Sequence, residues 1–322
     1  MKSFTLPHSI LSTISFFNAL SYPLTVAEIE EFLMFFTGST KAMDIITALD
    51  LLESRGMVKS ADGMYTVPHR TEIIKDRLAT YASCEKKYRI ARQATRVLAC
   101  IPFVRMICVV NSLAMNNAHE ESDIDFFIVT KKKRIWLTRF LVVALLDVLG
   151  KRPRGNMRKN MICTCFFASE DALDFSALQI PPLPDRQLPD LYLAWWASRF
   201  VPLYDEGGYA EKMFSVNEWA KGIFPRRRLY RTIQEHRVGL PFFGGWIKRI
   251  GEFLVRIMGR ASEHLARAIQ IRILPKSLRA LCNRDTRVVM NDQILKFHVR
   301  DMREEIRAKW YNTCKTYDIN FF

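Results

Sequence analysis

The sequence lacks the cysteine and histidine patterns that build disulfide scaffolds and zinc sites. Its seven cysteines form no Cys-x-x-Cys pair, and its six histidines form no His-Glu-x-x-His motif or Cys/His cluster. We therefore interpret the cysteines as buried thiols of a reducing compartment, which excludes a secreted disulfide framework and a structural zinc module. Cys163 and Cys165 are expected to share one face of a strand, because side chains two residues apart on a strand point the same way.

The chain also has little that could span a membrane. Its longest apolar run, residues 135–149, is interrupted by Arg139 and Asp147. A helix of that length rises roughly 22 Å, which is less than the hydrocarbon core of a bilayer at roughly 30 Å. The apolar segment near the N-terminus is broken by polar residues, and no clean cleavage site for a signal peptidase follows it. We therefore expect a soluble, cytoplasmic protein without an integral membrane segment.

Acidic residues are scarce relative to basic ones. The 322 residues include 48 Lys/Arg and 33 Asp/Glu, a net charge of +15. Residues 1–80 carry 7 basic and 9 acidic side chains, residues 81–160 carry 16 and 6, and residues 161–322 carry 25 and 18. The basic character of the last two segments favours a polyanionic partner such as a nucleotide, RNA or an anionic surface. The length suits two or three domains, and the 49% hydrophobic content suits a folded core.

Residues 1–78 resemble a winged helix-turn-helix domain. Apolar residues predict a first helix over residues 9–20. Thr25 and Glu28 form a capping-box sequence, which predicts the start of a second helix. After a third helix, the dipeptide at residues 62–63 is Asp-Gly, which predicts a hairpin turn and hence the wing.

The third helix decides how this N-terminal segment is interpreted. We expect Ser39 or Thr40 to cap it and Gly56 to end it. It exposes three acidic side chains against two basic ones, whereas nucleic-acid affinity depends mainly on contacts from basic residues to phosphates. DNA readout and a role in packing or protein contact both remain open, and the charge favours the second.

Residues 79–222 alternate between predicted helices and strands. The expected strands cover residues 105–111, 123–129, 161–168 and 201–204, and the expected helices cover residues 83–99, 134–149 and 191–200. This order predicts a small mixed sheet with helices packed on it. With the N-terminal segment, it places the protein in the α+β class.

Residues 223–322 are expected to be basic and mainly helical, with amphipathic stretches over residues 244–259 and 288–310. For the helix at 244–259 we expect the apolar face to pack on the core and the basic face to be solvated. Contact with an anionic membrane or with RNA remains an alternative. The basic run at residues 226–228 suits contact with an acceptor's phosphate backbone.

The most informative segment is residues 111–129. Asn111 and Ser112 form a turn at the end of one predicted strand, and Asp123 and Asp125 open the next. Because side chains alternate along a strand, the two carboxylates lie on the same face. They repel each other unless a cation lies between them, and hard oxygen ligands of this kind suit Mg²⁺.

This segment resembles the signature of the nucleotidyltransferase superfamily that includes DNA polymerase beta and the minimal nucleotidyltransferases. That signature is a Gly-Ser turn followed by a Ser-Asp-x-Asp strand with apolar residues after it. Here nine residues separate Ser112 from the run Ser122-Asp123-Ile124-Asp125. The resemblance covers residues 84–222 and implies a nucleotidyltransferase-type mixed sheet with helices.

The resemblance also implies an activity and a set of site residues. The activity is Mg²⁺-dependent transfer of a nucleoside monophosphate from an NTP to an acceptor hydroxyl, with RNA as one candidate acceptor. Asp123 and Asp125 are implied as the catalytic residues and metal ligands. Asn111, Ser112 and Ser122 are implied as nucleotide-binding positions.

Two departures from the signature keep an alternative open. Asn111 replaces the glycine of the turn, and the predicted strand over residues 161–168 contains no acid where the superfamily has a third carboxylate. The alternative is a catalytically degraded member that binds a nucleotide or RNA. In either case, either of the basic runs at residues 131–134 and 152–159 could reach a triphosphate or a polyanionic acceptor. A third interpretation makes the terminal segments protein contacts within a larger complex.

Overall fold

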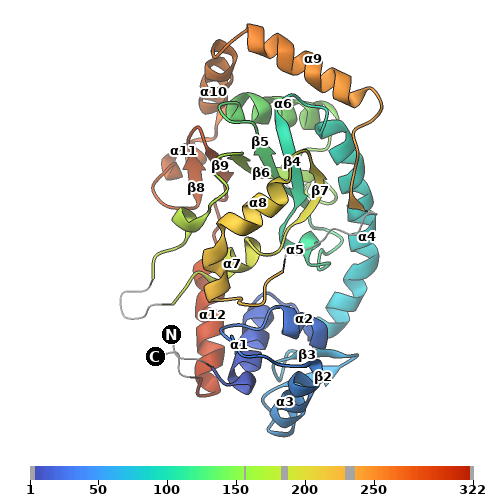
Figure 1. Cartoon of the computed structure of the whole chain (residues 1–322), viewed down its shortest axis with the longest axis vertical. Helices are drawn as coiled ribbons and strands as arrows, with labels where there is room; N and C mark the ends of the chain where they lie inside the picture. The colour runs from blue at the N-terminus through green and yellow to red at the C-terminus, as the bar shows by residue number, and fades with distance from the viewer. Residues whose placement is uncertain (1–3, 156, 183–187, 229–235, 320–322) are drawn as a thin grey trace.

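The computed structural model describes residues 4–155, 157–182, 188–228 and 236–319. Over these residues the protein is a mixed α and β structure, which confirms the α+β prediction at the level of class. Figure 1 shows an elongated molecule with the N-terminal helices at one end, a sheet in the middle and helix α9 at the other end.

The N-terminal end contains the predicted three helices and hairpin. The helices are α1 (Leu6–Ala19), α2 (Val26–Glu31) and α3 (Ala42–Ser54), and the strands are β1 (Leu24–Thr25), β2 (Lys59–Ala61) and β3 (Met64–Thr66), in the order β1-β3-β2. The hairpin turns at Asp62 and Gly63, whose φ angles of 50° and 71° are both left-handed, as a two-residue hairpin turn of the primed type requires.

The predicted cap of the third helix was wrong by one or two residues. The cap position of α3 is Lys41 rather than Ser39 or Thr40, and the Asp44 carboxylate accepts a hydrogen bond from the Lys41 backbone N–H at 2.7 Å. An acid in the first turn therefore satisfies the helix start instead of a hydroxyl.

The capping box of α2 forms as predicted and gives a first test of the local structure. The Thr25 hydroxyl accepts from the Glu28 N–H at 3.4 Å, and the Glu28 carboxylate accepts from the Thr25 N–H at 2.9 Å. We expect Thr25→Ala to lower the free energy of unfolding by about 1 kcal/mol, because one end of the helix loses its side-chain acceptor. Urea denaturation measures this, with the exposed Thr47→Ala on α3 as the control. Equal effects of the two substitutions would contradict the role of the cap.

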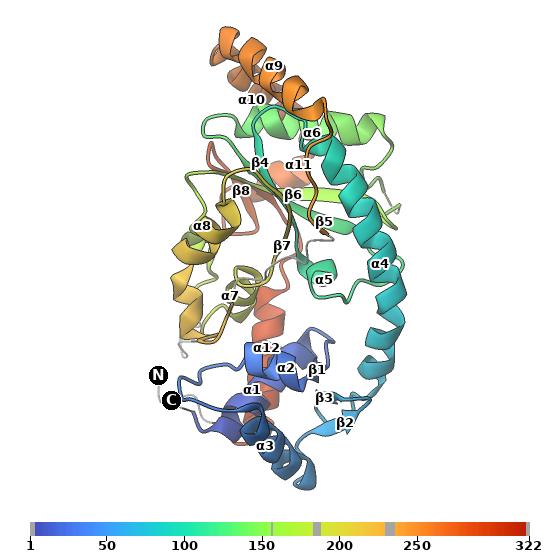
Figure 2. The same cartoon turned by 45° about the vertical axis from the view of Figure 1, so that its right-hand side comes forward.

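Helix α4 (Glu72–Leu98) begins earlier than the predicted residue 83. It runs along one side of the molecule from the N-terminal end toward α9, as both views show (Figures 1 and 2). Ile73 and Ile74 are buried near its start, and Tyr88 and Leu98 are buried along the part beside the sheet. Residue 78 lies inside this helix, so α4 joins the two parts of the chain without a linker.

The central sheet is mixed, as the sequence predicted, and over the described residues it has six strands. The strands are β4 (Val104–Val109), β5 (Ile124–Thr130), β6 (Ile162–Ser169), β7 (Val201–Asp205), β8 (Val288–Met290) and β9 (Ile294–Phe297). Their order is β7-β4-β5-β6-β9-β8. The β5–β6 pair is parallel and the other pairs are antiparallel. Helix α6 (Ile135–Val148) makes the crossover that the parallel pair requires.

Short helices in the connections between the strands complete the middle of the molecule. They are α5 (Asn111–Ala114), α7 (Leu191–Trp196) and α8 (Tyr209–Val216), with two single turns of 3₁₀ helix, η1 (Ser176–Leu178) and η2 (Glu218–Gly222). Helices α10 (Ala261–Ile273) and α11 (Lys276–Leu281) follow α9 (Gly244–Ile257). No helix among the described residues is both long enough and apolar enough to cross a bilayer.

The amphipathic stretch predicted over residues 288–310 was wrong. It contains the hairpin β8–β9, and only then helix α12 (Arg303–Thr316). The Asn291 side chain accepts hydrogen bonds from the N–H groups of Gln293 and Ile294 at 2.8 and 2.7 Å, so it stabilises the turn between the strands. The C-terminal region is therefore not purely helical: β9 extends the central sheet, and α12 packs on α1, where Trp310 donates to the Ser12 carbonyl at 3.1 Å.

Candidate functional site

The site lies where the end of β4 meets the start of β5. These strands are antiparallel, with Val109 opposite Phe126, so the turn after β4 lies beside Asp125. Asn111 has a left-handed φ of 58°, which asparagine tolerates better than most residues. Its Nδ2 donates to Asp125 Oδ2 at 3.0 Å, and the Tyr192 hydroxyl of α7 donates to its Oδ1 at 3.3 Å. Asn111 thus orients one of the carboxylates.

The structure brings Asp123 and Asp125 together and adds a thiol. One ligand atom from each of Asp123, Asp125 and Cys163 lies within 4.8 Å of the others, and all three side chains are half-buried. The parallel register puts Cys163 of β6 directly beside Asp125. Within the described parts of the chain, this group contains no third carboxylate, in agreement with the acid-free strand noted in the sequence.

The surroundings of Asp125 disfavour its charged form. Burial, and then the nearby negative charge of Asp123, raise the pKa of Asp125 from its ordinary 3.8 to about 6. Hydrogen bonds from Asn111 and Cys163 and the charge of Arg158 act in the opposite direction. A carboxyl group that titrates close to neutrality beside another carboxylate is typical of a functional site.

Cys163 belongs to a pair of thiols on β6. Its sulfur lies 3.0 Å from that of Cys165. The hydrogen bond with Cys165, burial and the nearby carboxylates raise the pKa of Cys163, so its thiol stays protonated at neutral pH. A neutral thiol is a weak ligand for a hard cation, whereas the two carboxylates are strong ones.

Asn111 and Ser112 also line a cavity of about 530 Å³ between α5, α7, β9 and α12. Its volume is in the range of small-molecule sites. Aromatic side chains line it (Phe166, Tyr192, Trp195 and Trp196), together with cationic ones (Lys296, Arg300, Arg303 and Lys309). The Asn111 side chain therefore lies between the carboxylate pair and a cavity whose charge suits an anion.

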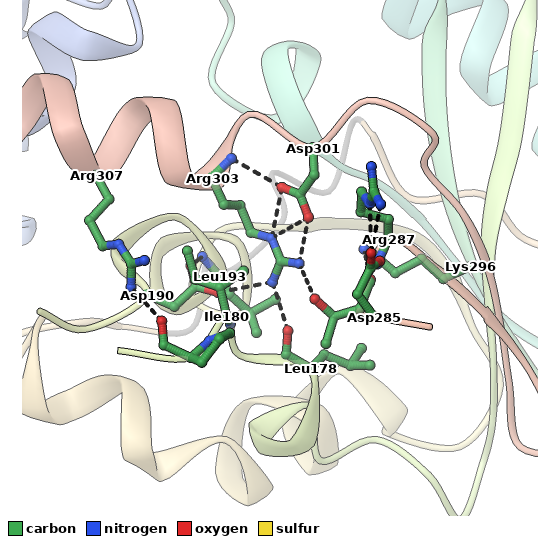
Figure 3. Close-up of polar contacts among 12 residues, drawn as sticks. Leu178, Ile180, Asp190, Leu193, Asp285, Arg287, Lys296, Asp301, Arg303 and Arg307 are labelled. Carbon is green, nitrogen blue, oxygen red and sulfur yellow. Dashed lines mark hydrogen bonds and ion pairs between the residues drawn. The ribbon is translucent and has the colours of Figure 1, made fainter. Parts of the chain in front are cut away.

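The cationic wall of this cavity is held by buried polar contacts (Figure 3). Arg303, at the start of α12, donates to Asp190 of α7 at 2.9 Å, to Asp301 at 2.6 Å and to the Leu178 carbonyl at 2.7 Å. Burial and the nearby Arg303 charge lower the pKa of Lys296 to about 8. The cavity wall therefore has a cation held by several hydrogen bonds, Arg303, and an amine, Lys296, that binds its proton less tightly than an ordinary lysine does.

Ser122 orders the loop before β5. Its hydroxyl donates to the His119 carbonyl at 2.7 Å, and its own carbonyl accepts from the buried Lys87 ammonium at 2.7 Å. Lys87 also donates to Asn160 Oδ1 at 3.0 Å, which joins this loop to the one before β6. The structure thus gives Ser122 a local partner, and His119 is exposed on the same loop.

Residues 131–134, which by sequence could reach a triphosphate or an acceptor, do not lie beside Asp123 and Asp125; contact with an acceptor stays a prediction. They follow the far end of β5, and the eight residue steps from Asp123 to Lys131 span roughly 26 Å of extended chain. In the second basic run, Arg152 and Arg154 pair with Asp147, and Lys159 pairs with acidic residues of the loop before β5. From this second run, the charge of Arg158 lowers the pKa of Asp125.

Sequence reasoning missed Cys163, Tyr192 and the cavity. The crossover β5–α6–β6 indicates that β6 lies beside β5, which was a signal that some residue of β6 contacts the carboxylates. Tyr192 and Lys296 carried no such signal, because they come from segments far away in the sequence.

Comparison with known proteins adds no relative: no protein-family model, no curated protein and no solved structure matches the chain.

Proposed function

We propose that the protein is a Mg²⁺-dependent nucleotidyltransferase that transfers a nucleoside monophosphate from an NTP to an acceptor hydroxyl. The observation that carries the proposal is the convergence of Asp123 and Asp125 at the start of β5, beside a cavity lined by Asn111 and Ser112. Paired carboxylates next to a cationic cavity are what a metal-bound triphosphate requires.

The residues present fit Mg²⁺. This ion keeps several waters and is commonly held by one or two carboxylates together with substrate phosphates. Asp123 and Asp125 provide those carboxylates, and the neutral Cys163 thiol leaves the remaining positions to water and phosphate oxygens. When bound, Mg²⁺ would stabilise the charge that develops on the attacking and leaving oxygens.

The chain's own residues would bind and orient the nucleotide. Asn111 fixes the orientation of Asp125 through its 3.0 Å hydrogen bond. Ser112 has a hydroxyl at the cavity wall, where it would donate to a phosphate oxygen, and the aromatic wall offers flat surfaces for a base. The net charge of +15 favours a polyanionic acceptor, and we propose RNA.

A second candidate is a nucleotide-binding protein without turnover. It is favoured by Cys163, because a protonated thiol at the position beside Asp125 cannot act as the base that activates an acceptor hydroxyl. The N-terminal segment, which resembles a winged helix, would in either case serve as a protein contact.

Nucleotidyl transfer is tested by incubating the full chain with α-labelled NTPs, Mg²⁺ and total RNA. We expect wild type to transfer label and release pyrophosphate, and we expect Asp123→Asn and Asp125→Asn each to reduce the rate at least about 100-fold, since each removes a ligand of the ion that stabilises the transition state. Asp174→Asn, which changes an exposed carboxylate near η1, is the matched control. Absence of transfer by wild type to any acceptor would contradict the enzymatic proposal.

Calorimetry then separates the two candidates. Nucleotide binding by wild type without pyrophosphate release supports the second. In that case Cys163→Asp, which supplies a third carboxylate beside Asp125, is expected to bind Mg²⁺ more tightly than wild type does. No binding of any NTP by wild type would exclude both candidates.

A further inference from the structure

Helix α9 presents its apolar face to solvent. Six large apolar side chains along it are between 54% and 70% exposed: Trp246, Ile247, Ile250, Phe253, Leu254 and Ile257. Phe242 and Phe243, just before the helix, are 89% and 69% exposed. The expectation that this face packs on the core was therefore wrong. In both views α9 lies at the end of the molecule farthest from α1 and α3 (Figures 1 and 2).

The polar side of α9 is the side that attaches it to the protein. Lys248 is buried and donates to Glu206 at 2.6 Å and to the Tyr204 hydroxyl at 3.0 Å. Glu252 accepts from Arg105 at 2.8 Å. Gly251 lies so close to Pro102 that a Cβ atom would be 2.5 Å from the ring. These contacts fix the rotation of the helix, so the apolar face cannot turn inward.

A basic cavity of about 410 Å³ borders this apolar face. It is lined by seven cationic side chains (Lys131, Lys132, Lys133, Arg134, Arg249, Arg256 and Arg260), and its one acid, Glu252, already pairs with Arg105. Phe253 belongs both to the cavity lining and to the exposed apolar face. A ligand seated here would meet positive charge on one side and apolar surface on the other.

We propose that α9 and the adjoining basic cavity bind the surface of an anionic phospholipid bilayer. Apolar side chains of an interfacial helix enter the boundary between headgroups and acyl chains, while neighbouring Arg and Lys residues bind lipid phosphates. The charges favour this partner over a second copy, which would place another strongly basic surface against this one. The apolar face also fits lipid better than RNA, because its Ile and Leu side chains cannot stack on bases.

Vesicle flotation of the full chain tests the proposal. We compare vesicles of phosphatidylcholine with vesicles that contain equal parts of phosphatidylcholine and phosphatidylglycerol. Wild type is expected to float with the anionic vesicles only, and Ile250→Ser/Ile257→Ser is expected to lower the partition coefficient at least about tenfold. Arg256→Gln/Arg260→Gln is expected to lower it about 20-fold at low salt.

Matched controls keep the result specific. Met43→Ser/Leu51→Ser removes two exposed apolar side chains of α3, and Arg55→Gln/Lys75→Gln removes two exposed charges, both at the other end of the molecule. Neither control should change flotation. In addition, brominated acyl chains should quench the fluorescence of the exposed Trp246, and Trp246→Phe should abolish most of that quenching.

Four results would overturn the proposal. The first is equal flotation of wild type and the α9 variants. The second is no flotation, with RNA binding that the α9 variants lose. The third is no flotation, with a concentration-dependent dimer that Ile250→Ser/Ile257→Ser dissociates. The fourth is no flotation, with inorganic phosphate that binds in the basic cavity, which would assign the cavity to a free anion.

Discussion

Asp125→Asn should make the metal-free protein more stable at pH 7.5 while strongly reducing the proposed nucleotidyl transfer. The wild-type carboxyl has a pKa of about 6 instead of its ordinary 3.8, because the fold buries it beside Asp123. A difference of this size corresponds to roughly 3 kcal/mol between the two protonation states. Asparagine has nearly the same shape and no charge, so we expect the free energy of unfolding to rise by about 2–3 kcal/mol.

The stability difference between Asp125→Asn and wild type should depend on pH in one direction. Because the pKa of Asp125 is higher in the folded than in the unfolded state, its contribution to stability is fully present below about pH 4 and is lost as the pH rises through about 6. The advantage of Asp125→Asn should therefore be large at pH 7.5 and nearly absent at pH 4. Urea denaturation in EDTA at both values measures it, with Asp50→Asn on the exposed face of α3 as the control.

Added Mg²⁺ should reverse the difference in stability, so that wild type becomes more stable than Asp125→Asn. On the proposed function, the ion would bind the folded wild type and stabilise it according to its concentration relative to Kd, whereas Asp125→Asn would have lost a ligand. A metal-free Asp125→Asn protein that is less stable than wild type at pH 7.5 would show that the Asp125 charge does not oppose folding.

The second large effect should come from Arg303, the buried cation at the start of α12. Its side chain is 5% exposed and its partner Asp190 is 1% exposed. Asp190 also accepts from the N–H groups of Leu193 and Ile180, so it links α7 to the preceding loop (Figure 3). Arg303→Met removes the charge and leaves a buried carboxylate without its cation. We expect the free energy of unfolding to fall by about 3–5 kcal/mol.

Thermal and urea denaturation measure the effect of Arg303→Met. Glu305→Ala is the control on the same helix, because Glu305 pairs with Lys309 at 2.8 Å on the exposed side of α12. Such a surface pair contributes at most about 0.5 kcal/mol. Similar losses for the two substitutions would show that the buried network is no more important than the surface pair. Since Arg303 lines the cavity, Arg303→Met should also weaken nucleotide binding.

Local patterns in the sequence predicted those elements whose energetics depend on neighbouring residues. The capping box at Thr25 and Glu28 and the hairpin turn at Asp62 and Gly63 both form. Caps and turns are stabilised by contacts within a few residues of the chain, so a short window contains the information. The alternation at Asp123 and Asp125 is of the same kind, because strand geometry alone puts the two side chains on one face.

Structural elements that depend on contacts with distant parts of the chain were predicted less well. The stretch over residues 288–310 was expected to be one amphipathic run, but β9 pairs with β6 and buries Leu295 in the sheet. Tertiary contacts overrode the helical pattern there. For α9, periodicity predicted the helix but not the direction of its apolar face. That direction is decided by Glu252 and Lys248. Glu252 pairs with Arg105, which lies more than a hundred residues earlier in the chain, and Lys248 pairs with Glu206, which lies more than forty residues earlier.

The sequence by itself determined the α+β class, the positions of most helices and strands, and the carboxylate pair at the start of β5. The tertiary structure alone decided that a thiol lies beside Asp125, that a cavity opens at Asn111 and Ser112, and that the apolar face of α9 points outward. The physical reason is the distance along the chain between the residues that interact. Turns, caps and alternation depend on adjacent residues, whereas strand register, cavities and the orientation of a helix depend on contacts between segments that the sequence keeps far apart.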